Sequence, residues 1–137
     1  MMQPRLTSRL RVEAMLRMAT SAGVTGAILR RGDAQAGSIY IKIARLDGTA
    51  DLYGPAPGPG LDDAGRPRWS RLRQACDDAD AEAYVQTRAR VDPDLWLIEI
   101  EDRDGRAFLD GILETEAASE TDPLLAAVFG PGHGRGG

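Results

Sequence analysis

The stretch that decides the fold is residues 38–53, SIYIKIARLDGTADLY. Isoleucine recurs at every second position from Ile39 to Ile43, while residues such as Lys42 lie between. This period of two residues is typical of a strand with one face on the core and the other toward solvent. The Asp47-Gly48 pair that follows supplies the positive φ of a tight turn. The stretch therefore predicts an antiparallel hairpin.

The flanking segments extend this hairpin into a sheet. Residues 25–31 form another extended run, joined to the hairpin through residues 32–37, so we expect a three-stranded meander over residues 25–55. Residues 95–101, LWLIEIE, are apolar on both faces through Ile98, which predicts a central strand. A turn over residues 102–105 is expected to lead into residues 106–109 as a second hairpin.

Two main helices are expected on one face of this sheet. Ser8 is the predicted N-cap of the first helix, and Gly23 ends it. The second helix is expected over residues 78–90, where acidic residues at the start and Arg at the end suit the helix dipole. The predicted fold class is α+β, a single domain with a mostly antiparallel sheet of about five to six strands.

The 137 residues are expected to divide into a core domain over residues 1–111 and a tail over residues 112–137. Residues 54–67 are rich in Gly and Pro and predict an exposed loop within the core domain. The tail is interpreted as an acidic linker, a short apolar helix at residues 123–129 and a disordered Gly-rich end.

The short C-terminal helix is a candidate interface. A helix of this length is marginal alone, since isolated helices below about 12 residues are unstable in water. It is therefore expected to dock on its own sheet, on a second copy or on another protein. The residues that would make this contact are Leu124, Leu125, Val128 and Phe129.

Charge is distributed unevenly along the chain. Residues 1–31 carry six Arg and one Glu, whereas residues 92–122 carry eleven acidic residues and two Arg. The two ends therefore attract each other, either within one chain or between copies. The net charge of −4 argues against nucleic acid as a partner.

Composition excludes several classes of protein and site. An apolar content of 42% is too high for a disordered chain, and no apolar run is long enough to cross a membrane. The single histidine, His133, lies in the Gly-rich tail, so Cys76 has no fixed base and no zinc site can form. We expect no catalytic residue, no cofactor, and a cytoplasmic location without a secretory signal.

A group of acidic residues suggests one alternative to a non-catalytic function. Under this alternative, two acids on a strand and two in the following turn would face one ion such as Mg²⁺, with Lys42 completing the site of a phosphodiester hydrolase. The competing interpretation is an ordinary Asp-Gly turn. The candidate ligands are Glu99, Glu101, Asp102 and Asp104.

A basic run with one aromatic residue, residues 66–73, suggests a second alternative function. Arginines would contact phosphate groups while the tryptophan stacks on a base, which would make the protein an anion or nucleic-acid binder. The competing interpretation is that the tryptophan packs in the core and the arginines pair with Asp77, Asp78 and Asp80. The candidate residues are Arg66, Arg68, Trp69, Arg71 and Arg73.

Several segments together resemble a family of alphaproteobacterial proteins, domain of unknown function 1491. The most specific are DPDLW at residues 92–96 and IEIEDRDG at residues 98–105, with RRGD at residues 30–33 and LDG at residues 46–48 in support. The resemblance runs from about Arg5 to Leu109. It implies no activity, cofactor or catalytic residue. The function we favour is therefore a small, non-catalytic cytosolic interaction protein that self-associates.

Overall fold

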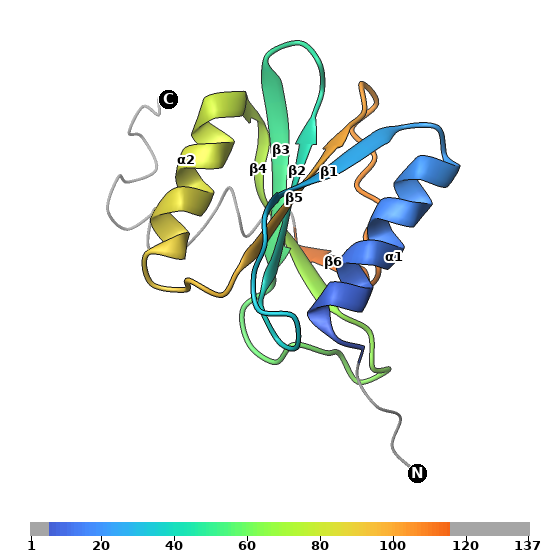
Figure 1. Cartoon of the computed structure of the whole chain (residues 1–137), viewed down its shortest axis with the longest axis vertical. Helices are drawn as coiled ribbons and strands as arrows, with labels where there is room; N and C mark the ends of the chain where they lie inside the picture. Colours follow the sequence, from blue (N-terminus) through green and yellow to red (C-terminus); the bar gives the residue numbers. More distant parts are fainter. Residues whose placement is uncertain (1–5, 116–137) are drawn as a thin grey trace.

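The computed structural model describes residues 6–115, which form one sheet with a helix on each side (Figure 1). Six strands lie in the order β1-β5-β2-β3-β4-β6. All neighbours are antiparallel except the pairs β2–β5 and β4–β6. The α+β class and the single, mostly antiparallel sheet are confirmed. The elements are α1 (Ser8–Ser21), β1 (Thr25–Arg30), β2 (Ile39–Ala44), β3 (Thr49–Pro55), β4 (Arg68–Asp77), α2 (Asp78–Ala89), β5 (Trp96–Glu101) and β6 (Ile112–Thr115).

The hairpin predicted over residues 38–53 is present as β2 and β3. Leu46 and Gly48 both adopt positive φ in its turn, at 66° and 89°. The Asp47 carboxylate accepts hydrogen bonds from the Thr49 amide at 2.9 Å and from its hydroxyl at 2.6 Å. The turn is thus closed by its own side chains, which is why it could be predicted locally.

The three-stranded meander predicted over residues 25–55 is wrong, because β5 lies between β1 and β2. The segment between β1 and β2 instead crosses the start of β5. Asp33 N–H donates to the Asp94 carbonyl at 2.9 Å, and the Trp96 indole N–H donates to the Asp33 carbonyl at 2.8 Å. Gly32 makes this crossing possible, since a Cβ there would lie 2.1 Å from the Asp94 carbonyl oxygen.

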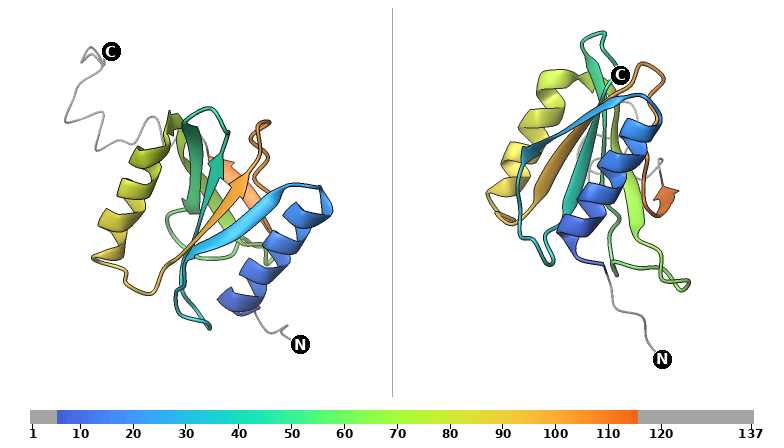
Figure 2. Two further views of the ribbon diagram at one scale, coloured as in Figure 1. Left: turned by 45° about the horizontal axis from the view of Figure 1, so that its top comes forward. Right: turned by 45° about the vertical axis from the view of Figure 1, so that its right-hand side comes forward.

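The prediction that both helices lie on one face is also wrong. Figures 1 and 2 show α1 and α2 on opposite sides of the sheet. Under α1, Val12 and Met15 pack on Ile41 and Ile98, whereas the core under α2 contains Tyr40 and Leu97. Alternate residues of β2 and β5 therefore enter different cores, and the supposed solvent face of β2 is buried.

The start of α1 differs by one residue from the prediction. Thr7 is the N-cap, and its hydroxyl accepts from the Leu10 amide at 3.2 Å. Ser8 is buried, and its hydroxyl donates to the Gly37 carbonyl at 2.6 Å. Ser8 thus fixes α1 to the segment before β2 instead of capping the helix. The second helix begins at Asp78 as predicted.

The basic run from Arg68 onward is part of strand β4, which extends to the residue before α2, while Arg66 lies in the preceding loop. The loop predicted over residues 54–67 begins two residues later, because Gly54 and Pro55 still pair with β4. The Arg68 guanidinium holds this loop through the carbonyls of Pro57 and Pro59, at 2.8 and 2.6 Å. Most of the loop is exposed, as expected.

The second hairpin predicted at residues 106–109 is wrong. The chain runs from β5 through an irregular segment to the opposite end of the sheet, where β6 pairs with β4. The sheet therefore continues past residue 111, the predicted end of the core domain. Within this segment the Arg11 guanidinium contacts Asp110 at 2.7 Å, so the oppositely charged ends attract each other within one chain. The helix predicted at residues 123–129 lies outside the described residues.

Asp102 organises the start of this irregular segment. Its carboxylate is 5% exposed and accepts from the Arg106 amide at 2.8 Å and from the Arg106 guanidinium at 2.9 Å. The hydrogen bond from the Arg106 side chain holds the pKa of Asp102 below its usual value. The charged form is stabilised by folding, so this contribution is complete above the unfolded-state pKa of about 4 and is lost as the pH falls through the lower folded-state pKa.

We expect Asp102→Asn to lower the urea midpoint of unfolding at pH 7, because the neutral amide cannot replace the carboxylate bonds to Arg106. The difference from wild type should shrink below about pH 4, where Asp102 itself becomes protonated. Asp104→Asn, at an exposed neighbouring position, is the control and should leave the midpoint unchanged. Equal midpoints for Asp102→Asn and wild type at pH 7 would contradict this role.

Candidate functional site

Lys42 is a buried charged residue on the face of the sheet that α2 covers. Lys42 on β2 lies opposite Glu99 on β5 in the parallel register, so both side chains point to this face. Asp78 and Glu82, one helical turn apart at the start of α2, point down to the same place. We refer to Asp78, Glu82 and Glu99 as the acidic cluster.

The Lys42 ammonium contacts all three carboxylates. Its Nζ lies 2.9 Å from Asp78 Oδ1 and 2.9 Å from Glu99 Oε2, and it also bonds Glu82. The Lys42 side chain is 1% exposed, whereas those of Asp78 and Glu82 are 44% and 43% exposed. One ammonium against three carboxylates leaves two negative charges uncompensated. The site is therefore closed around Lys42 and anionic toward solvent.

The protonation of Lys42 is set by these contacts. Burial alone would lower the pKa of the ammonium, but the hydrogen bonds to Glu82, Glu99 and Asp78 outweigh it, and the pKa lies above the ordinary value. Lys42 is thus a cation at neutral pH and has no lone pair with which to act as a base or nucleophile. Its role here is to balance charge beneath α2.

Carboxylate oxygens of the acidic cluster lie within 4.8 Å of one another, a spacing that suits a divalent cation. All three carboxylates already contact the Lys42 ammonium, so a metal ion would compete with it or bind on the outer side. The cluster can therefore attract a cation from the solvent side, where Asp78 and Glu82 are exposed.

The structure separates the four acids predicted as metal ligands. Of the four, only Glu99 belongs to the acidic cluster. It contacts Lys42, as the hydrolase interpretation required. Asp102 pairs with Arg106, while Glu101 and Asp104 are exposed. Sequence reasoning missed the two acids of α2, although their i, i+4 spacing on a helix places them on one face and was available as a signal.

The basic run is engaged in internal contacts. The Trp69 side chain is buried at 1% exposure, and its indole N–H donates to Asp110 at 3.0 Å, so no face is presented for stacking a base. The Arg68 guanidinium forms a two-bonded pair with Glu114, and Arg66 pairs with Asp62. Arg73 stacks over Tyr84 at 4.8 Å. Arg66 and Arg68 thus pair with Asp62 and Glu114 and not with the predicted Asp77, Asp78 or Asp80.

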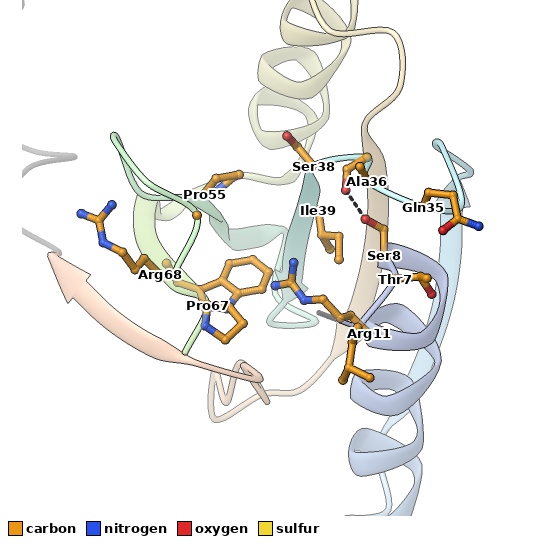
Figure 3. Close-up of a pocket in the computed structure, with 14 residues that line it drawn as sticks. Thr7, Ser8, Arg11, Gln35, Ala36, Ser38, Ile39, Pro55, Pro67 and Arg68 are labelled. Carbon is orange, nitrogen blue, oxygen red and sulfur yellow. Dashed lines mark hydrogen bonds between the residues drawn. The ribbon is translucent and has the colours of Figure 1, made fainter. Parts of the chain in front are cut away.

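A cavity of about 320 Å³ lies between the start of α1, the segment before β2 and the start of β4 (Figure 3). Arg11 and Arg68 border it, but both are engaged by carboxylates. The first amides of α1 donate to the carbonyls of Ala34 and Gln35, so they are not free for an anion. The two arginines and the first amides of α1 are therefore engaged within the chain.

A second cavity, of about 230 Å³, lies on the α2 side beside the free margin of β1. We call it the edge groove. It is lined both by apolar side chains and by three polar ones, those of Arg30, Glu82 and Gln86. Glu82 belongs to both features, so the groove adjoins the acidic cluster. The other residues that define it are Leu29, Val85, Ala89 and Leu97.

No nucleophilic site is assembled among the described residues. Cys76 is half-buried, and burial raises the pKa of its thiol, which opposes thiolate formation. His133 and the interface candidates Leu124, Leu125, Val128 and Phe129 lie outside the described residues. Neither described helix is long and apolar enough to span a membrane.

A family model described as a protein of unknown function, DUF1491, matches residues 6–110. The chain belongs to the DUF1491 family. The crystal structure of a DUF1491 protein from Caulobacter crescentus shares 36% identity and a TM-score of 0.68, over 80% of this chain and 98% of that one. Protein Atu0922 from A. tumefaciens, solved in solution, shares 29% identity and a TM-score of 0.70, over 82% and 99%. No curated protein matches the chain.

These matches confirm the resemblance seen in the sequence. They establish the family and the fold of this DUF1491 protein, and they attach no activity to either. Both similar structures are matched over nearly their whole length, so the elements that build the acidic cluster and the edge groove fall within the shared domain.

We expect Lys42→Met in this DUF1491 protein to reduce the free energy of unfolding by about 3 kcal/mol, because three carboxylates are left without their buried counter-charge. Urea unfolding at pH 7 measures the change. Glu82→Gln is the matched control, since Lys42 keeps two carboxylates, and it should cost less than about 1 kcal/mol. Equal losses in the two variants would show that the ammonium does not hold α2 on the sheet.

Proposed function

We propose that this DUF1491 protein is a non-catalytic interaction protein that self-associates by antiparallel pairing of β1 with β1 of a second copy. The observation that carries this proposal is the position of β1 at one end of the sheet. In the part of the chain that the structure describes, its outer backbone edge pairs with no other strand. An unpaired edge is a template for a further strand.

β1 has few of the features that usually protect an edge strand, the irregularity between Ile28 and Arg30 being one of them. Its sequence, TGAILR, contains no Pro, no Lys and no acidic residue, and its one charge is at its end. Leu29 on this strand is 45% exposed. Val91, 74% exposed, precedes the segment that touches the end of β1 through Arg30 and Pro93. Pairing with a second copy would remove this apolar surface from water.

The two faces of β1 also favour addition of a strand. α1 packs against β1 on one face, whereas α2 packs over β2, β3 and β4 and leaves β1 open on the other. An added strand would extend the sheet over this open side and cover the edge groove. The helix predicted at residues 123–129 lies outside the described residues, and its role as an interface stays a prediction.

The non-catalytic part of the proposal is supported by how the reactive side chains are engaged. Lys42 is held protonated, Asp102 binds Arg106, and the pKa of the Cys76 thiol is raised by burial. A single cysteine also suits a reducing compartment, which supports a cytoplasmic location. We propose no nucleic-acid or membrane partner, since the net charge is −4.

Leu29→Lys tests the self-association. Two copies of the introduced charge would face a desolvated interface, so the mass measured by light scattering should fall from dimer to monomer. Leu46→Lys is the matched control, because Leu46 is 55% exposed in the turn between β2 and β3, away from β1. Its mass should remain that of the wild type. A monomeric wild-type protein at millimolar concentration would refute the proposed function.

A second candidate, a divalent-metal-dependent phosphodiester hydrolase, is favoured by one observation, the closeness of the three carboxylates within 4.8 Å. Under this candidate, millimolar Mg²⁺ or Mn²⁺ raises the melting temperature, as any ligand specific for the folded state must. The increase should be absent in Glu99→Gln. We expect the melting temperature of the wild type to be unchanged by either ion, because the Lys42 ammonium occupies the ligand oxygens; a clear increase would favour the hydrolase.

A further inference from the structure

We propose that the acidic cluster is part of the self-association surface and that it receives the partner's Arg30. This inference rests on the proposed function. It is carried by the register of the sheet, by the charge of the cluster and by the small side chain that separates the cluster from the edge.

The register places one row of residues across the α2 face of the sheet. Ala27 on β1 lies opposite Glu99 on β5, and Glu99 lies opposite Lys42 on β2. Ala27 is therefore the only residue of this row between the acidic cluster and the outer edge. Its exposed methyl group is too short to cover Glu99. A side chain on an added strand can thus reach the cluster over Ala27.

The irregularity in β1 decides which residue of a second copy would face Ala27. Ile28 lies opposite Ile98 and Arg30 opposite Leu97, so Leu29 is an extra residue in the strand. Arg30 therefore shares the α2 face with Ala27, although the two are three positions apart. Without the extra residue, Arg30 would point to the α1 face.

A symmetric pair of β1 strands then follows from this register. If a two-fold axis sets Ile28 opposite the partner's Ile28, and Leu29 is an extra residue in the new pair as it is against β5, Ala27 lies opposite the partner's Arg30 on the α2 face. By symmetry Arg30 lies opposite the partner's Ala27. The isoleucine pair at the axis is a favourable cross-strand contact. One interface thus brings two arginines to two acidic clusters.

The distance between the two groups is suitable. Neighbouring strands are about 4.8 Å apart, so the backbone of the partner's Arg30 would lie two such spacings from that of Glu99. An extended Arg side chain is longer than one such spacing, so the partner's Arg30 can reach over Ala27 toward the carboxylates of Glu99 and Glu82 while Glu99 stays 2.9 Å from Lys42. In the single chain the Arg30 guanidinium donates to the Pro93 carbonyl at 2.9 Å and is exposed, which leaves it accessible to a second copy.

The charges are complementary. The cluster keeps two uncompensated negative charges and is open toward the edge groove, of which Glu82 is a member. A guanidinium placed there would be partly shielded from water between α2 and the added strand, where ion pairs weaken less with salt than at an open surface. Such contacts fix the register and suppress other pairings.

Charge reversal on either side tests the inference, with sedimentation equilibrium at several salt concentrations as the measurement. Arg30→Glu puts a carboxylate against the cluster, and Glu82→Lys puts an ammonium against the partner's Arg30. Each variant alone should raise the dissociation constant of the dimer by at least about tenfold. Thermal unfolding followed by circular dichroism is the control that both variants are folded.

The mixture of the two variants is the decisive measurement. In a mixed dimer, Glu at position 30 faces the cluster with Lys at position 82, and Arg30 faces the unchanged cluster. Native mass spectrometry should therefore show the mixed dimer in excess over either homodimer. A dissociation constant for Arg30→Glu equal to that of the wild type, or a mixture without mixed dimers, would overturn the pairing of Arg30 with the cluster while self-association stands. A wild-type monomer would overturn both.

Discussion

The parallel pairing of β5 with β2 is the constraint on which the rest of the structure depends. It places β5 between β1 and β2, so that β5 and β2 each have a neighbouring strand on both sides. Strands buried on both faces need cover on both, which is why α1 and α2 lie on opposite sides. The same pairing sets Glu99 against Lys42 and moves β1 to the end of the sheet, so it creates both the acidic cluster and the free edge.

The acidic cluster contributes both to the stability of the fold and to the charge of the surface. Lys42 is held beneath α2 by three carboxylates, two of which are at the start of the helix, where negative charge is also favoured by the helix dipole. A buried ion pair of this kind adds little to stability beyond an apolar contact, but removal of one partner is costly. The excess negative charge lies on the exposed side of the cluster, next to the edge groove.

Local signals in the sequence were interpreted correctly where a feature closes within a few residues. The β2–β3 hairpin is closed by Asp47 and Gly48, and α2 begins at Asp78 as its acidic first turn indicates. β5 was placed centrally because its residues are apolar on both faces. The second hairpin failed because the turn at Asp102 binds Arg106 and leads the chain away from β5, although an identical Asp-Gly signal closes β2 and β3.

By itself, the sequence determined the fold class, the hairpin and the ranges of both helices along the chain, because periodicity, caps and turns act between neighbours in the chain, and its motifs indicated the family. Only the tertiary structure decided the strand order, the two-sided cover of the sheet and the partners of each charge. Lys42 and Glu82 are 40 positions apart, and no local pattern indicates that they meet. Their contact follows from the docking of α2 over β2, which depends on the summed burial of many apolar side chains and not on any short motif.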